Sequence, residues 1–167
     1  MRRRSFIALG LTAGALAWWA GRQGLPLSGM HQGRLSPDSR VVLTGAAYAI
    51  LQGCLPTSPA AARIALLAML DRIDELIGQL PSASQAELSQ LMGLLCSAPG
   101  RRLLAGLEKD WNEASVDEID AALEGMRHSS LAPRQQAYLA LHEIITGAYF
   151  ADSSSWPRIG YPGPMTI

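Results

Sequence analysis

Prolines divide most of this chain into short segments, and this punctuation constrains the fold more than any other feature of the sequence. Ser36-Pro37 and Ser58-Pro59 each place an N-cap serine before a proline at the first helical position, where a backbone N–H would have no helical partner. Pro81 stands at the expected end of the second helix, because proline cannot continue a helix. The prolines therefore predict a series of helices joined by short turns.

Apolar residues inside these segments recur every three or four positions, which is the spacing of one helix face. Two more helices are predicted from capping-box patterns that begin at Ser84 and Ser115, and a last one opens at Pro133. No stretch alternates β-branched residues. We therefore expect an all-α fold, an irregular bundle of about five helices over residues 36–152. The clearest apolar stripe is Leu66, Leu70, Ile73, Ile77 and Leu80.

Between the two capping-box segments, Pro99-Gly100 interrupts the chain and residues 101–107 are predicted to form a short helix. We expect its leucines to face inward. Trp111 follows in a polar turn and is expected to close one end of the core. The three leucines are Leu103, Leu104 and Leu107.

The N-terminus, residues 1–20, has the pattern of an export signal, a basic start followed by a short apolar run. Arg3-Arg4 followed by Ser5-Phe6-Ile7 resembles the twin-arginine signal, an address that a receptor reads. An ordinary secretory leader and an uncleaved anchor helix over residues 6–20 are the alternatives. Residues 21–35, rich in Gly, Gln and Ser, are predicted to be a linker.

The charge balance of the body argues against nucleic acid as a partner. The 14 basic and 14 acidic residues cancel, but without Arg2, Arg3 and Arg4 the basic residues fall from 14 to 11, which leaves a charge near −3. A nucleic-acid-binding face would be basic. The sequence also lacks the phosphate-loop, dinucleotide, zinc-protease and haem-attachment motifs, so no cofactor or metal site is predicted in this chain.

Two pairs of residues, Cys54 with Cys96 and His142 with Glu143, invite a chemical interpretation without settling it. Cys54 and Cys96 are the only cysteines, and an oxidising compartment would allow them to form a disulfide. The alternative is two free thiols, because a buried free cysteine packs as a small hydrophobic residue in a helical core. His142 shares a helix face with Tyr138 and Ile145. With Glu143 it is the one pair that suggests catalysis, and the competing interpretation is a histidine packed in a helix interface.

The last segment, residues 153–167, is predicted to be an extended tail, because Pro157, Pro162 and Pro164 oppose a helix and a central strand. It nevertheless carries aromatic residues, which disordered tails usually lack. We expect it to pack on its own helices or on another protein, and the two are compatible. The predicted partner-docking residues are Tyr149, Phe150, Trp156, Ile159, Tyr161, Pro162 and Pro164.

The leader, the helical body and this ending together resemble a known family. The run from Ala148 to Asp152 and the Trp156-Pro157-Arg158-Ile159-Gly160-Tyr161-Pro162-Gly163-Pro164 ending look like the small subunits of glucose–methanol–choline-type dehydrogenases, closest to the gluconate 2-dehydrogenase subunit 3 group. The run from Pro99 to Leu107 looks like the middle of such proteins. The spacing between Asp152 and Trp156 is shorter than in gluconate dehydrogenases, which leaves the substrate class open.

The resemblance implies a non-catalytic periplasmic subunit. Such a subunit binds no flavin, pairs with a large subunit that carries FAD, supplies the twin-arginine signal for both, and works beside a cytochrome c that accepts the electrons. Two alternatives are a stand-alone enzyme or ligand-binding protein that uses His142 and Glu143, and a membrane-anchored structural protein.

Overall fold

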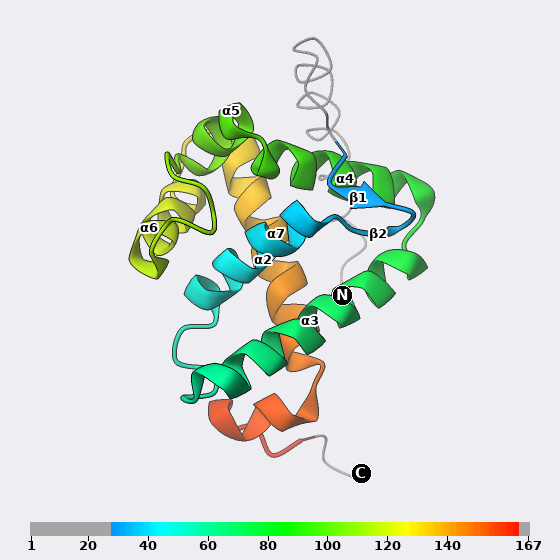
Figure 1. Ribbon diagram of the computed structural model, residues 1–167, viewed down its shortest axis with the longest axis vertical. Helices are drawn as coiled ribbons and strands as arrows, with labels where there is room; N and C mark the ends of the chain where they lie inside the picture. The colour runs from blue at the N-terminus through cyan, green and yellow to red at the C-terminus, as the bar shows by residue number, and fades with distance from the viewer. Residues whose placement is uncertain (1–27, 164–167) are drawn as a thin grey trace.

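The computed structural model describes residues 28–163, and these form an all-α fold, as the sequence predicts (Figure 1). Residues 1–27, with Arg3, Arg4 and Phe6, lie outside the described part, as does Pro164. Five longer helices make the bundle: α2 (Pro37–Ile50), α3 (Pro59–Gln79), α4 (Ser82–Cys96), α6 (Val116–Arg127) and α7 (Ala132–Phe150). Between α4 and α6 lie the single turn α5 (Ala98–Gly100) and the π-helix η1 (Arg101–Ala105).

Helix α2 lies at the centre of the bundle and packs against α3, α4, α6 and α7. Figure 1 shows α2 and α7 crossing near the middle, with α6 on one side and α3 on the other. Each longer helix contributes at least one fully buried apolar side chain to a single core, which explains why helices with modest apolar stripes still assemble. One such residue from each helix is Leu43, Ile73, Leu95, Met126 and Ile145.

The helix starts predicted at Ser36 and Ser115 are confirmed, because both side chains form capping hydrogen bonds. The Ser36 hydroxyl accepts a hydrogen bond from the Ser39 N–H at 3.1 Å, and Ser115 with Glu118 forms the predicted capping box. The box predicted at Ser84 is wrong. Helix α4 begins at Ser82, directly after Pro81, so Ser84 already lies inside the first turn.

Residues 30–35 differ from the predicted linker because they form a small antiparallel hairpin, β1 (Met30–His31) and β2 (Arg34–Leu35). Its two turn residues, Gln32 and Gly33, both have positive φ, at 51° and 75°, which the tight turn requires. Met30 and Leu35 are buried against the bundle. A strand of two residues shows no readable alternation, so the sequence pattern gave no sign of it.

Side chains from distant parts of the chain satisfy the carbonyl groups at the ends of several helices. The Trp111 indole N–H donates to the Leu95 carbonyl of α4 at 2.9 Å, and Trp111 is 2% exposed, which confirms its predicted place at one end of the core. Arg134 Nε donates to the Leu104 carbonyl of η1 at 2.8 Å. Helix ends carry carbonyls without intrahelical partners, so these contacts lock neighbouring helices together.

One inward-facing prediction fails in the π-helix η1. Leu103 is 51% exposed, while Leu104 and Leu107 are buried as expected. The wider π turn, closed by the bond from the Gly106 N–H to the Arg101 carbonyl, changes which side chains face the core.

Candidate docking surface at the C-terminal segment

The C-terminal end of α7 has every terminal carbonyl paired, and this pairing builds the segment that follows. The four last carbonyls of a helix have no partner within the helix. Here they accept, in order from Gly147 to Phe150, from the Ala151 N–H at 3.1 Å, Arg72 Nε at 2.8 Å, the Asp152 N–H at 3.3 Å and the Trp156 indole N–H at 2.8 Å.

Residues Ser153–Ile159 form a 3₁₀-helix, η2, where the sequence predicted an extended tail. Asp152 caps it, since one carboxylate oxygen accepts from the Ser154 N–H at 2.9 Å. The other oxygen pairs with Arg72 Nη1 of α3 at 3.0 Å. Pro157 lies inside η2, because the fixed φ of proline suits a short 3₁₀ turn and only one backbone donor is lost.

The Asp152 carboxylate has one charged partner, Arg72, and one backbone donor, the Ser154 N–H. The hydrogen bond from the Ser154 N–H and the nearby Arg72 guanidinium hold the pKa of Asp152 below its usual value of 3.8. The carboxylate is therefore ionised at neutral pH and remains paired with α3.

Three of the predicted docking residues serve the chain's own fold. Tyr149 is 3% exposed and its hydroxyl donates to the Cys54 carbonyl at 2.9 Å, which ties α7 to the turn after α2. Burial raises the pKa of this tyrosine. Its ring meets Phe150 edge-on at 5.2 Å, and Phe150 is half-buried. Trp156, also half-buried, uses its only polar atom to cap α7.

Ile159, Tyr161 and Pro162, by contrast, are exposed on the turn that ends η2. The Tyr161 ring packs edge-on against Trp156 at 5.2 Å, and its N–H donates to the Trp156 carbonyl at 3.1 Å. The chain then passes so close over the indole that a Cβ on Gly163 would lie 3.3 Å from it. Trp156 therefore acts as the platform on which the exposed turn rests.

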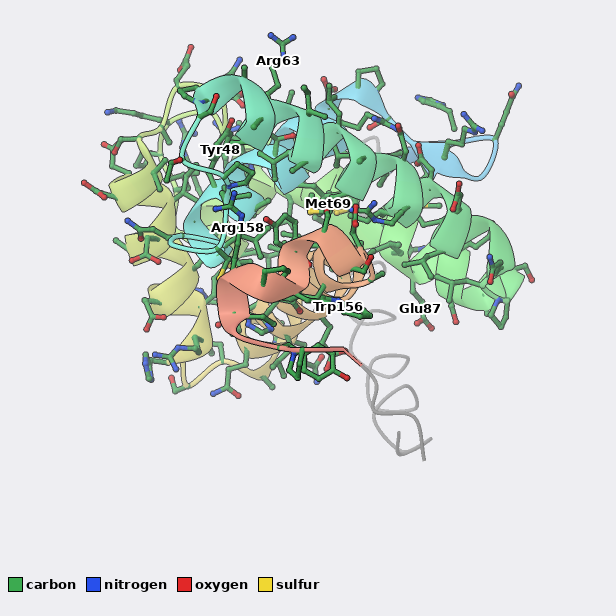
Figure 2. All side chains as sticks on the ribbon, turned by 90° about the horizontal axis from the view of Figure 1, so that it is seen from below. Tyr48, Arg63, Met69, Glu87, Trp156 and Arg158 are labelled. Atoms are coloured by element: carbon green, nitrogen blue, oxygen red, sulfur yellow. The ribbon has the colours of Figure 1, made fainter. Side chains whose placement is uncertain are left out.

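Arg158 lies on the same segment and points toward the turn between α2 and α3. Its Nη1 donates to the Leu55 carbonyl at 3.5 Å, a long and weak hydrogen bond. In Figure 2 Arg158 and Trp156 lie on opposite sides of η2, the first toward the α2–α3 turn. The segment thus carries a positive group on one side of η2 and the turn that rests on Trp156 on the other.

The other residues with predicted chemical roles are not brought together. His142 is half-buried, with its ring 5.7 Å from that of Tyr138 on the same helix, and Glu143 is exposed. Neither lines the depression at the other end of the molecule, a hollow of about 320 Å³ between α2 and the loop before α6. Its lining residues are Asp38, Val41, Val42, Cys96, Asp110, Trp111, Asn112 and Glu113.

This depression is acidic, and two of its groups, Asp110 and Cys96, have structural partners. Asp110 pairs with Arg101 Nη1 at 3.1 Å and accepts from the Trp111 N–H at 2.7 Å. Burial raises the pKa of Cys96, whose sulfur lies 3.7 Å from the Ser39 hydroxyl. Within residues 28–163, no group of three or more His, Cys, Asp or Glu side chains is placed to hold a metal ion.

The disulfide considered from the sequence is not formed, because Cys54 and Cys96 are both free. Cys96 lies beside Ser39 in the first turn of α2, and Cys54 follows the last turn of the same helix. A helix of 14 residues is about 20 Å long, whereas a disulfide needs Cα atoms within about 7 Å. The two thiols therefore lie at opposite ends of α2, too far apart to pair.

Comparison of the chain with protein-family models, with curated proteins and with solved structures finds no match. Within the described part of the chain, no helix has the length and apolar character that a membrane span requires.

Proposed function

We propose that this chain is a non-catalytic small subunit of a periplasmic, flavin-dependent dehydrogenase that oxidises an alcohol or a sugar. It escorts the flavoprotein large subunit through the twin-arginine translocase and stabilises it afterwards. FAD belongs to the large subunit, and a cytochrome c is the proposed electron acceptor. Arg3, Arg4 and Phe6 of the leader carry the export address.

The observation that carries this proposal is the way the C-terminal segment is built. Arg72, Asp152 and Trp156 fix η2 onto α3 and α7, while Ile159 and Tyr161 stay exposed. Because the folded chain already orders this apolar, aromatic turn, binding through it loses less conformational entropy than binding through a flexible tail would. Exposed aromatic residues are also common anchors in protein interfaces.

The leader and the family resemblance supply the rest of the proposal. An export signal of the twin-arginine type suits cargo that folds before export, and a cofactor-bearing partner is such cargo. The sequence contains no flavin- or nucleotide-binding motif of its own, which favours a role as partner.

The test is co-expression with a tagged large subunit of the glucose–methanol–choline type that has no leader. We expect the flavoprotein to reach the periplasm with this chain bound, and to stay in the cytoplasm with the variant Arg3→Lys plus Arg4→Lys. Arg2→Lys is the matched control and is expected to export normally.

Export of the flavoprotein that does not depend on this chain contradicts the proposal. So does an enzymatic activity of the isolated chain that His142→Ala removes, because that result favours the stand-alone enzyme. Fractionation of the same cells tests the membrane-anchored alternative, since an anchored chain stays with the membranes.

A further inference from the structure

The aromatic C-terminal end divides into side chains that hold the fold and side chains that face solvent. Tyr149 and Trp156 make internal hydrogen bonds to Cys54 and Phe150. Ile159 is 47% exposed and Tyr161 is 45% exposed. The sequence made no distinction between these four residues.

The exposed pair sits on a backbone with little freedom. Gly160, between them, has φ of 70°, a left-handed conformation that ends η2 and turns the chain. The Tyr161 N–H is tied to the Trp156 carbonyl, and the Tyr161 ring rests on the indole. A turn held at this many points presents Ile159 and Tyr161 as a fixed projection rather than a loose end.

Charge adds the third feature of this projection. No carboxylate in residues 28–163 lies within ion-pair distance of Arg158, whereas the nearby Arg72 is neutralised by Asp152. A partner that covers Ile159 and Tyr161 and extends around η2 toward the α2–α3 turn therefore also meets an unpaired positive charge. Complementarity then calls for a carboxylate on that partner.

We infer that Ile159 and Tyr161 insert into an apolar socket on the flavoprotein large subunit, with Arg158 pairing to a carboxylate at the rim of the socket. This inference rests on the proposed function. Trp156 and Tyr149 are positioning residues that hold the projection and do not themselves contact the partner.

A second copy of this chain fits the projection less well than a different protein does. The acidic depression beside α2 offers Asp38 and Glu113 to Arg158. Of its apolar lining residues, Val42 and Trp111 are 1% and 2% exposed, so only Val41, which is 36% exposed, offers an apolar contact for Ile159 and Tyr161. Self-association therefore satisfies the charge but not the apolar pair.

The experiment measures the affinity of this chain for the purified, co-expressed glucose–methanol–choline-type large subunit. We expect Ile159→Ala and Tyr161→Ala each to weaken binding by about tenfold or more, as residues at the centre of an interface do. Leu139→Ala is the matched control, since Leu139 is 50% exposed on α7, and it should bind like the wild type. Both test residues are half-exposed, so urea unfolding should be little changed.

Two further variants separate contact from positioning. Arg158→Gln should slow association and reduce its dependence on salt, because a rim charge acts mainly through long-range attraction. Trp156→Phe removes the hydrogen bond to Phe150, so it should speed hydrogen exchange across residues 153–161 while weakening binding less than Tyr161→Ala.

The outcomes distinguish this inference from the proposed function. A complex that forms normally with both Ile159→Ala and Tyr161→Ala overturns the inference and leaves the proposed function standing. Absence of any complex with the wild-type chain overturns both. The remaining case is a second copy of this chain as the occupant, and sedimentation of the chain alone tests it. A dimer that dissociates in the Arg158→Gln variant identifies the second copy as the occupant and refutes the inference.

Discussion

Replacing Arg72 by Met tests whether one side chain of α3 holds the C-terminal segment in place. Arg72 Nε donates to the Ala148 carbonyl at 2.8 Å and its Nη1 pairs with Asp152 at 3.0 Å. Met keeps most of the apolar stem that packs against the helix, so the change removes the polar contacts and little else.

The magnitude follows from the burial of the two contacts. A hydrogen bond from a charged donor contributes about 1.5–3 kcal/mol to stability, and an ion pair between partly exposed groups about 0–1 kcal/mol. The Arg72 and Asp152 side chains are 26% and 36% exposed, so both values belong near the lower end. We therefore expect Arg72→Met to lower the free energy of unfolding by about 2 kcal/mol.

The assay is urea unfolding followed by circular dichroism, combined with hydrogen exchange of residues 153–160. Exchange of η2 should accelerate in Arg72→Met, while the slope of the unfolding curve stays unchanged. Arg63→Met is the matched control, because Arg63 is exposed on the same helix and forms no ion pair with any residue in 28–163. Equal stability losses in the two variants would refute the reasoning.

Acid titration separates the ion pair from the cap on η2. Asn replaces Asp152 as a helix cap but cannot pair with Arg72 as an anion. Because the folded pKa of Asp152 lies below 3.8, its contribution is complete above the unfolded pKa and is lost as the pH falls through the folded pKa. The stability difference between wild type and Asp152→Asn should therefore be constant near neutrality and vanish in acid, as unfolding curves at several pH values will show.

Three further predictions concern the body of the bundle. Trp111→Phe should cost about 1–2 kcal/mol in urea unfolding, because the buried Leu95 carbonyl loses its donor. Gly29→Ala should cost about 1–3 kcal/mol, since its Cβ would clash with the Cβ of Met92 in α4. Gly78→Ala, at an exposed position of α3 with open space around it, should instead stabilise the protein by up to about 1 kcal/mol. Burial raises the pKa of Cys96, so at pH 7 iodoacetamide should modify it more slowly than a small-molecule thiol, until urea unfolds the chain.

Local signals in the sequence predicted the helices well, because the groups that start a helix lie within one turn of each other. Ser36 and Ser115 cap the helices that they precede, and the apolar stripe of α3 is buried from Leu66 to Ile77. Ser84 misled because α4 begins two residues earlier, at Ser82, although its N-cap, Pro81, makes no side-chain hydrogen bond.

The sequence alone indicated the candidate docking residues but could not tell which of them pack into the chain's own fold. These residues all lie at the C-terminal end, yet aromatic composition alone does not separate an anchor of the fold from an exposed contact. The partners that make the difference, Arg72 for Ala148 and Cys54 for Tyr149, are 76 and 95 residues away in the chain.

The sequence by itself determined that the body of the chain forms five longer helices and that its ending is aromatic, because both properties arise from neighbouring residues. Only the tertiary structure decided that residues 30–35 pair as a hairpin, that residues 153–159 coil into a 3₁₀-helix, and that Ile159 and Tyr161 stay outside while Tyr149 turns inward. The physical reason is that unpaired carbonyls at helix ends take whichever donors the folded bundle brings to them, and those donors come from far along the chain.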